Sequence, residues 1–117
     1  MDEASQCFFS GGVSGGAGEE CVYVLLCQHG KYYVGWSREV ETRIASHFLG
    51  NGSCWTKKYP PIEVLSVKRG NKLLENCITI ALMAKHGFQN VRGGTYCKVE
   101  LANAPASLAK AISYMDK

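Results

Sequence analysis

Apolar side chains in the first half of the chain follow the patterns of β-strands. Residues 21–28, CVYVLLCQ, and residues 31–36, KYYVGW, are rich in β-branched and aromatic residues, and only the dipeptide HG separates them. Such runs are typical of strands, and a turn this short joins neighbouring antiparallel strands. Residues 62–69, IEVLSVKR, alternate apolar and polar side chains, as a half-buried strand does. The pattern therefore predicts a β-hairpin and, later, a third strand.

Helical periodicity follows the hairpin directly. Apolar residues recur every four positions, at Val40, Ile44 and Phe48, and the pattern stops at Gly50. Ser37 is placed to act as the N-cap, because its side-chain oxygen can accept a hydrogen bond from the first turn. The spacing predicts a helix of about three turns.

A second helix is predicted over residues 71–87, which form the most hydrophobic helical segment of the chain. It opens on a capping asparagine and closes on a glycine, a residue that suits the position after a helix end. Apolar side chains surround much of this segment, so we expect it to be the buried central helix. A third helix is expected over residues 104–115, whereas residues 51–61 and 88–98 are expected to form loops or short irregular segments.

The element order β-β-α-β-α-α predicts a mixed α/β fold, in which a small three-stranded antiparallel sheet is flanked by helices. A chain of 117 residues suits one compact core, which we place in residues 20–117. Residues 1–19 are rich in Gly and Ser and have no apolar periodicity, so we expect them to form a flexible leader.

Composition excludes several classes of protein. A hydrophobic fraction of 46% and a charged fraction of 20% are ordinary for a globular domain and argue against a fibrous or disordered chain. The net charge of +3 is compatible with a polyanionic partner without requiring one. The six cysteines lack the C-x₂-C pairing of zinc modules and are interpreted as reduced, small apolar residues. No signal peptide or membrane-spanning segment is apparent, so we expect an intracellular protein, cytosolic or nuclear, without a membrane partner.

Five residues carry the chemistry that the sequence offers. Arg43 and His47 lie one helical turn apart, so their side chains share a face at the border of the core. Glu75 falls in the most hydrophobic helix, where a carboxylate is costly unless it is paired or bound to a cation. Tyr23 and Tyr33 lie on the two hairpin strands and are expected to project to the same face. Together these groups could serve as a phosphate clamp, a proton carrier, a metal ligand and candidate bases, which are the parts that phosphodiester hydrolysis needs.

At these positions the chain resembles the GIY-YIG nucleases. The two tripeptides of the family name stand here as CVY, residues 21–23, and YVG, residues 33–35. The resemblance covers nearly everything from residue 21 to residue 97 and implies the GIY-YIG nuclease fold. The ordered set continues with an R-x-x-x-H motif, a glutamate on a following helix and an asparagine: Arg43, His47, Glu75 and Asn90.

The resemblance implies a role for each of these residues. Glu75 would be the sole protein ligand of one Mg²⁺ or Mn²⁺, and Arg43 would contact the scissile phosphate. His47 would hydrogen-bond a tyrosine or the phosphate and help to move the proton. Tyr23 or Tyr33 would take a proton from the attacking water, and Tyr23 is slightly favoured. The ordinary pKa of tyrosine is ~10, so the metal and Arg43 would have to stabilise the phenolate.

Further residues have supporting roles in this hypothesis. Gly35 would let the backbone come close to the helix start, and Asn90 would brace the Glu75 side of the site, although both residues could be purely structural. Trp36 stands where some relatives carry a lysine, so phosphate contacts at that point are doubtful. Contacts to the DNA backbone are expected instead from basic residues that could also be ordinary surface charges: Lys31, Lys57, Lys58 and Arg69.

Three functions are therefore compared. The first is a metal-dependent endonuclease that hydrolyses DNA, including branched or nicked DNA. The second is a DNA-binding module of the same fold that cuts little unless a protein partner supplies specificity, because no separate recognition domain is present and the charge is modest. The third is a structural protein in which Arg43 and Glu75 only form an ion pair. The preferred DNA, the cleavage of RNA and the oligomeric state stay open at this stage.

Overall fold

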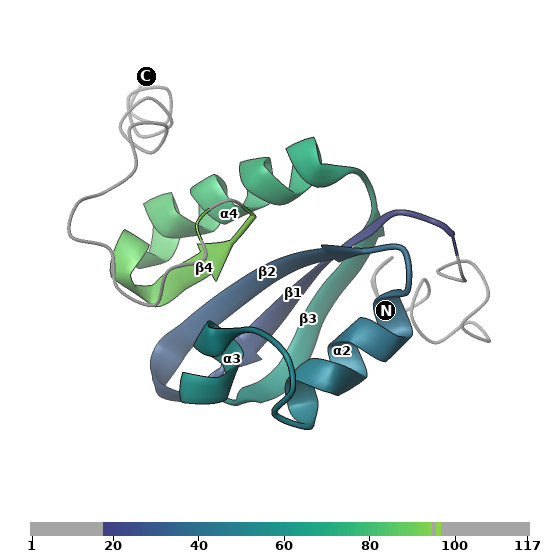
Figure 1. Ribbon diagram of the computed structural model, residues 1–117. Helices are drawn as coiled ribbons and strands as arrows, with labels where there is room; N and C mark the ends of the chain where they lie inside the picture. The colour runs from purple at the N-terminus through teal and green to yellow at the C-terminus, as the bar shows by residue number, and fades with distance from the viewer. Residues whose placement is uncertain (1–17, 95, 97–117) are drawn as a thin grey trace, which may run out of the picture.

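The computed structural model describes residues 18–94 and residue 96. Figure 1 shows a single sheet with helices on both sides of it. The predicted helix over residues 104–115 and most of the predicted leader over residues 1–19 lie outside the described residues. The elements are, in chain order, β1 (Cys21–Cys27), the short 3₁₀ helix η1 (Gln28–Gly30), β2 (Lys31–Ser37), α2 (Val40–Phe48), α3 (Cys54–Lys58), β3 (Pro61–Arg69), α4 (Lys72–His86), η2 (Phe88–Asn90) and β4 (Val91–Gly93).

The sheet has four strands in the order β3-β1-β2-β4, one more than predicted. Strand β1 pairs antiparallel with both β2 and β3, which confirms the predicted hairpin and third strand. Strand β4 pairs parallel with β2, from Tyr32 opposite Val91 to Val34 opposite Gly93. The prediction of a loop or irregular segment was wrong at these three residues. Such a short strand shows no alternation of its own, and only its pairing to the edge of β2 makes it a strand.

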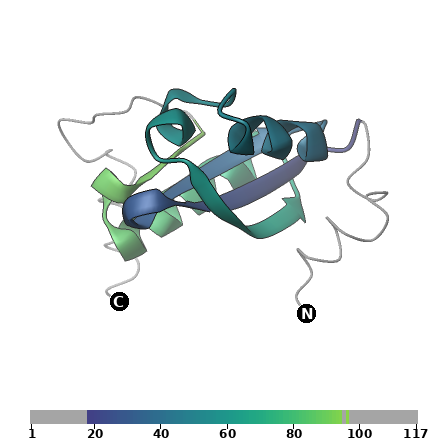
Figure 2. The same cartoon turned by 90° about the horizontal axis from the view of Figure 1, so that it is seen from below.

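Helices α2 and α3 cover one face of the sheet and α4 covers the other (Figures 1 and 2). The apolar run of β1 divides between these faces because successive strand residues point in opposite directions. Tyr23 and Leu25 join the cluster that includes Ile44 of α2. Val22 and Val24 instead pack toward side chains of α4. A strand that reads as continuously apolar is therefore a strand buried on both faces.

Helix α2 begins at Val40, later than predicted. Ser37 is still the last residue of β2, and Glu39 occupies the N-cap position. The predicted capping interaction survives in part, because the Glu39 N–H donates to Ser37 Oγ at 2.8 Å. Ser37 therefore supports the turn that leads into the helix and is not its N-cap.

The buried face of α2 differs from the predicted stripe at its last position. Val40 and Ile44 are buried as expected, but Phe48 is 44% exposed and His47 is fully buried in its place. Positions i, i+4 and i+7 of a helix lie on one face, whereas i+8 has turned toward its edge. The face of α2 that meets the sheet therefore places the imidazole, and not the phenyl ring, in the core.

Helix α4 has the predicted ends but not the predicted burial. The Leu74 N–H donates to the side chain of Asn71 at 3.1 Å, and Gly87 has a φ of 95° after the last turn. Burial is confined to the side that faces the sheet, whereas Leu73 is 69% exposed. The helix covers one face of the sheet, so it is not the buried central helix that its composition suggested. Its fully buried residues are Thr79, Ile80 and Met83.

Helix α3 lies in the segment that was expected to be a loop, residues 51–61. A capping box begins it: the Thr56 N–H donates to Ser53 Oγ, and the Ser53 N–H donates to Thr56 Oγ1, both at 3.1 Å. Trp55 is buried, and its Nε1–H donates to the carbonyl oxygen of Tyr32 at 2.9 Å. These contacts attach α3 to β2.

None of the described helices is long and apolar enough to cross a membrane.

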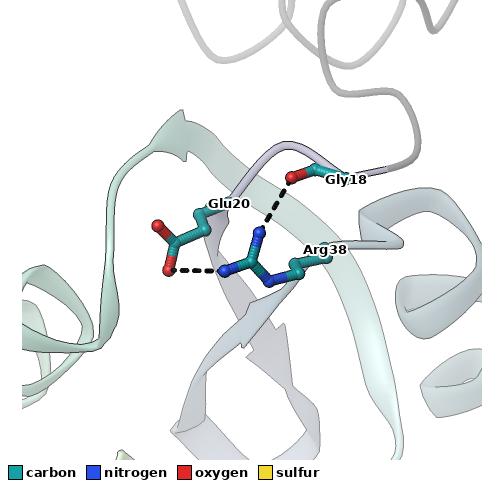
Figure 3. A network of polar contacts seen from close by, with 3 residues as sticks. All are labelled: Gly18, Glu20 and Arg38. Atoms are coloured by element: carbon teal, nitrogen blue, oxygen red, sulfur yellow. Dashed lines mark hydrogen bonds and ion pairs between the residues drawn. The ribbon is translucent and has the colours of Figure 1, made fainter.

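Polar contacts attach the segment before β1 to neighbouring elements. Arg38 donates a hydrogen bond to the carbonyl oxygen of Gly18 at 3.1 Å and lies 4.0 Å from the carboxylate of Glu20 (Figure 3). Arg69 at the end of β3 forms an ion pair with Glu19 at 3.3 Å. Such exposed pairs contribute only about 0–1 kcal/mol each, so they orient this segment more than they stabilise the fold.

Candidate active site

The strand register places the two hairpin tyrosines on the face that α2 covers. Tyr23 is opposite Gly35, and Tyr33 is opposite Leu25. The two tyrosines are therefore diagonal neighbours on adjacent strands, and their side chains project from the same face of the sheet. Their ring centroids are 6.3 Å apart. Tyr23 is almost fully buried, whereas Tyr33 is half-buried. The predicted shared face is confirmed.

Gly35 is required by the ring of Tyr23. A Cβ atom at position 35 would overlap the phenol ring and its hydroxyl. Any larger residue would therefore displace the tyrosine or move β2 away from β1. The space that this glycine leaves open belongs to the tyrosine ring on the neighbouring strand, a contact that the sequence did not indicate.

His47 connects the Tyr23 hydroxyl to α3. Its Nε2 atom lies 2.8 Å from Tyr23 Oη, and its Nδ1 atom lies 2.8 Å from Thr56 Oγ1. The ring of Tyr33 packs beside the imidazole, with centroids 4.8 Å apart. Burial, and then the positive charge of Arg43, lowers the pKa of His47 to about 4. The imidazole is therefore neutral near pH 7, with one nitrogen that donates and one that accepts.

Arg43 lies one turn before His47 and acts on Tyr23. Burial raises the pKa of Tyr23 well above its usual range, and the nearby Tyr33 raises it further. The charge of Arg43 and its hydrogen bond to Tyr23 lower this pKa. In the free protein the phenol is therefore protonated near pH 7, and additional positive charge is needed before it can act as a base.

Glu75 lies in the first turn of α4, which covers the opposite face of the sheet. Its negative charge raises the pKa of Tyr23, so the two side chains are electrostatically coupled. Burial raises the pKa of Glu75 itself, while the backbone N–H of Gly94 and the charge of Lys72 oppose this shift. Strand β4 ends at Gly93, opposite Val34. We infer that the site spans the edge of the sheet just beyond this end.

The donor set at Glu75 fits a weakly held divalent cation. Within the described part of the chain, no group of three or more His, Cys, Asp or Glu residues could hold a metal ion. A single carboxylate supplies hard oxygen ligands of the kind that Mg²⁺ and Mn²⁺ prefer, and Mg²⁺ commonly keeps several waters. Because burial penalises the charged form of Glu75, a nearby cation would stabilise that form. Water and phosphate oxygens would have to complete such a site.

Arg43 and Glu75 do not form an ion pair in the structure. The ion pairs recorded within residues 18–94 join Arg38 to Glu20 and Arg69 to Glu19. Both Arg43 and Glu75 instead act electrostatically on Tyr23. The structural alternative, in which these two residues only hold two helices together, therefore has no contact to support it in this part of the chain.

Asn90 lies away from Glu75. Its side chain accepts a hydrogen bond from Lys31 Nζ and donates one to the carbonyl oxygen of His86, both at 2.8 Å. Glu75 is in the first turn of α4 and His86 is in the last, a separation of about 16 Å at 1.5 Å per residue. Asn90 therefore does not brace the Glu75 side of the site, as had been expected. Its contacts join the start of β2 to the end of α4.

The basic residues expected to contact DNA fall into two groups. Lys57 and Lys58 are exposed on α3, and the ammonium groups of Lys58 and Lys31 lie 5.6 and 5.2 Å from the ring centroid of Tyr59. Arg69 is at the opposite end of the strands, where β3 meets the start of β1, and it is paired with Glu19. The structure therefore places Lys31 and Lys58 beside the same ring, with Lys57 next to Lys58 on α3, and separates Arg69 from them.

Sequence reasoning missed three residues that touch the site. Thr56 contacts His47, the backbone N–H of Gly94 faces Glu75, and a Cβ atom at Gly52 would overlap the imidazole of His47. One signal was present in the sequence, because Ser53 and Thr56 have the spacing of a capping box. The surrounding Gly, Ser and Pro residues favoured the interpretation as a loop.

Comparison with known proteins shows which family the sequence resembles. Residues 19–75 match the family model described as the GIY-YIG catalytic domain, a segment that includes every candidate catalytic residue but not Asn90. A UPF0213 protein of Xanthomonas campestris is 40% identical over 45 residues, which are 38% of this chain and 44% of that protein. A UPF0213 protein of Natronomonas pharaonis is 36% identical over 53 residues, 45% of this chain and 62% of that protein. The matches thus span about half the length of these curated relatives, and no solved structure gave a significant match.

Proposed function

Because the chain belongs to the GIY-YIG catalytic domain family through residues 19–75, a family of nuclease type, we propose that it is a metal-dependent endonuclease that hydrolyses phosphodiester bonds of DNA. The observation that carries this proposal is the set of groups around one phenol. Tyr23 Oη lies 2.8 Å from His47 Nε2, and the pKa of Tyr23 is lowered by Arg43 and raised by the charge of Glu75. An imidazole, a guanidinium and a carboxylate thus all influence the same phenol.

The proposed roles follow from these surroundings. Arg43 binds the scissile phosphate and offsets the charge that develops as water attacks. A divalent cation held by Glu75 supplies further positive charge and polarises the phosphate. Tyr23 receives the proton of the attacking water, because it has both a proton acceptor in His47 and a cationic partner in Arg43. Tyr33 is the alternative base, since it is less buried and packs beside the same imidazole.

Support for DNA as the polyanion comes from the α3 side of the molecule. Lys31, Lys57 and Lys58 lie on the side of the sheet that also carries the two tyrosines. Phosphates on either side of the scissile bond would contact these lysines in addition to Arg43. Arg69 would add little, because it is ion-paired at the other end of the strands.

The test is cleavage of linear, nicked, flapped, four-way-branched and supercoiled DNA in Mg²⁺, Mn²⁺ or EDTA. Arg43→Ala and Glu75→Gln are each expected to lower kcat by about 100-fold or more, because each removes charge stabilisation at the phosphate. Glu63→Gln is the matched control, since Glu63 is an exposed carboxylate on β3. Circular dichroism and thermal unfolding would show whether each variant is folded.

Three outcomes would overturn parts of the proposal. Equal cleavage in Mg²⁺ and EDTA would exclude the metal requirement. Cleavage that persists in both Arg43→Ala and Glu75→Gln would place the active site elsewhere. Folded protein that binds the panel but cuts none of it would favour a partner-dependent DNA-binding module, a function with which the modest net charge of +3 is also compatible.

A further inference from the structure

Thr56 makes a contact that the proposed catalytic roles do not use. The imidazole of His47 is fully buried between Tyr23 Oη and Thr56 Oγ1, with 2.8 Å on each side. Thr56 is itself 1% exposed. A buried histidine held at both nitrogens has its ring orientation fixed, so the remaining question is which nitrogen carries the proton.

The contacts of Thr56 Oγ1 indicate its hydrogen-bonding state. The Ser53 N–H donates to this oxygen at 3.1 Å. The Thr56 hydroxyl can donate to the Ser53 carbonyl oxygen at 3.2 Å, and the Ser53 hydroxyl oxygen also lies 3.2 Å from Thr56 Oγ1. A hydroxyl has one hydrogen and two lone pairs. When the hydrogen points to the carbonyl, one lone pair is used by Ser53 and the second faces His47 Nδ1. That nitrogen must then be the donor.

The surroundings of Tyr23 Oη lead to the same assignment from the other side of the ring. This hydroxyl lies 2.8 Å from His47 Nε2, and it is close enough to Arg43 for that guanidinium to lower its pKa. A guanidinium has no acceptor, so among these partners only Nε2 can receive the phenol hydrogen. If Nε2 carried the proton instead, both groups could only donate to the phenol oxygen, and neither of these two partners could accept the phenol hydrogen.

We propose that Thr56 is a positioning residue that holds His47 in the Nδ1–H tautomer, so that the Nε2 lone pair faces the hydroxyl hydrogen of Tyr23. This inference deepens the proposed function and rests on it for its catalytic consequence. The tautomer itself is a property of the free protein. It can therefore be tested even if no cleavage is found.

Helix α3 is held where this contact requires it. The capping box with Ser53 orients the Thr56 hydroxyl, and Trp55 attaches the helix to the Tyr32 carbonyl oxygen of β2. Gly52 lies so close to the imidazole that a side chain there would overlap His47. The segment between α2 and β3 thus packs against the imidazole of His47 on the side away from Tyr23.

The proton transfer that this arrangement permits is balanced. As the oxygen of water forms a bond to phosphorus and the bond to the leaving oxygen breaks, one water proton passes to Tyr23 Oη. The original phenol hydrogen moves to His47 Nε2, which produces an imidazolium with two N–H groups. In that state both nitrogens donate, and Thr56 Oγ1 still accepts from Nδ1. The Thr56 contact therefore suits His47 before and after the transfer.

The test combines three variants with two measurements. Thr56→Val removes the hydroxyl with little change in shape, and Thr56→Ser keeps it. Ser53→Ala removes the hydroxyl that caps α3 and lies 3.2 Å from Thr56 Oγ1, and keeps the backbone contacts of Ser53. Long-range ¹H–¹⁵N NMR of the imidazole would identify the tautomer in each protein. We expect the Nδ1–H tautomer of His47 in the unsubstituted protein and in Thr56→Ser. In Thr56→Val we expect that single tautomer to be lost.

Kinetics on the cleaved DNA would then show the consequence. Thr56→Val is expected to lower kcat by about 10- to 100-fold with little change in KM, because a misaligned base affects the chemical step. Thr56→Ser should restore most of this loss. Ser53→Ala should reduce thermal stability and lower kcat less than Thr56→Val does, because the backbone N–H and carbonyl oxygen of Ser53 still contact Thr56 Oγ1. An Nε2–H tautomer in the unsubstituted protein would overturn the proposal, and so would unchanged kcat and tautomer in Thr56→Val. If Thr56→Val does not fold, the tautomers that NMR finds in the unsubstituted protein and in Thr56→Ser test the proposal.

Discussion

The two halves of the candidate site are built differently. On the α2 side, His47 and Tyr23 are buried, and their polar atoms lie within hydrogen-bonding distance of other side chains of the protein. On the α4 side, Glu75 is a half-buried carboxylate that faces one backbone N–H group. The protein thus orders the groups that would move a proton, and leaves the charged half to be completed by ions, water and phosphate.

This difference has an electrostatic consequence. Burial raises the pKa of Tyr23 and lowers the pKa of His47, so both groups are neutral near pH 7 in the free protein. A buried neutral pair of this kind is stable but poorly basic. Positive charge arriving on the Arg43 and Glu75 side would lower the pKa of Tyr23. We therefore expect the buried half to become reactive only when the open half is filled.

The largest expected effect comes from removing the phenol oxygen of the buried half. Tyr23→Phe is expected to lower kcat by about 100-fold or more, the usual contribution of a positioned general base. Tyr33→Phe should cost less, because the hydroxyl that contacts His47 Nε2 in the structure is that of Tyr23. Single-turnover cleavage of the preferred DNA would measure both. A larger loss in Tyr33→Phe than in Tyr23→Phe would assign the base to Tyr33.

Burial of His47 predicts a pH dependence of stability. Its pKa is about 4 in the folded protein and near 6.5 in an unfolded chain, so below about pH 6.5 the unfolded state binds the extra proton. Stability contributed by the neutral imidazole is present above that pH and is lost as the pH falls toward 4, by about 2–3 kcal/mol.

Denaturant unfolding between pH 4 and pH 7 would measure this loss. His47→Gln should flatten the slope. Because the raised pKa of Glu75 acts in the opposite direction over part of this range, the comparison is sharpest in a Glu75→Gln background. An unchanged slope in His47→Gln would mean that His47 does not control the transition.

Packing of Tyr23 against Gly35 predicts a smaller cost. Gly35→Ala is expected to destabilise the fold by about 1–3 kcal/mol, because the added methyl group overlaps the ring on the neighbouring strand. Thermal or urea unfolding would measure the change. The double variant Gly35→Ala with Tyr23→Ala is the control, since removal of the ring should make the glycine substitution much less costly. Additive effects would show that the overlap does not cause the loss.

The smallest effect is expected at the exposed lysines. Joint replacement of Lys57 and Lys58 by Ala should weaken DNA binding modestly, and the slope of log affinity against log salt should become shallower by about 0.9 for each phosphate that is no longer neutralised. Lys85→Ala is the matched control, because Lys85 is exposed on α4. Fluorescence anisotropy at several salt concentrations would measure the slopes. An equal change in the control would mean that the α3 side has no special role in binding.

Local sequence determined several elements of this protein. The hairpin strands, the strand after the loop and both ends of α4 followed from runs, alternation and capping residues that act over a few positions. The candidate catalytic residues were proposed from local spacing and from the resemblance to the GIY-YIG nucleases, and all five lie within residues 19–75, which the family model matches. Such signals are readable because strand and helix periodicities depend on neighbouring residues.

Only the tertiary structure decided how these pieces meet. Strand β4 exists because β2 offers a free edge, and His47 rather than Phe48 is buried because it lies on the face of α2 that meets the sheet. Thr56 contacts His47 from a segment that looked like a loop, and Asn90 bonds to Lys31, which is 59 positions earlier in the chain. A contact between distant residues depends on where sheet edges and helix ends lie in space, and no local pattern encodes that position.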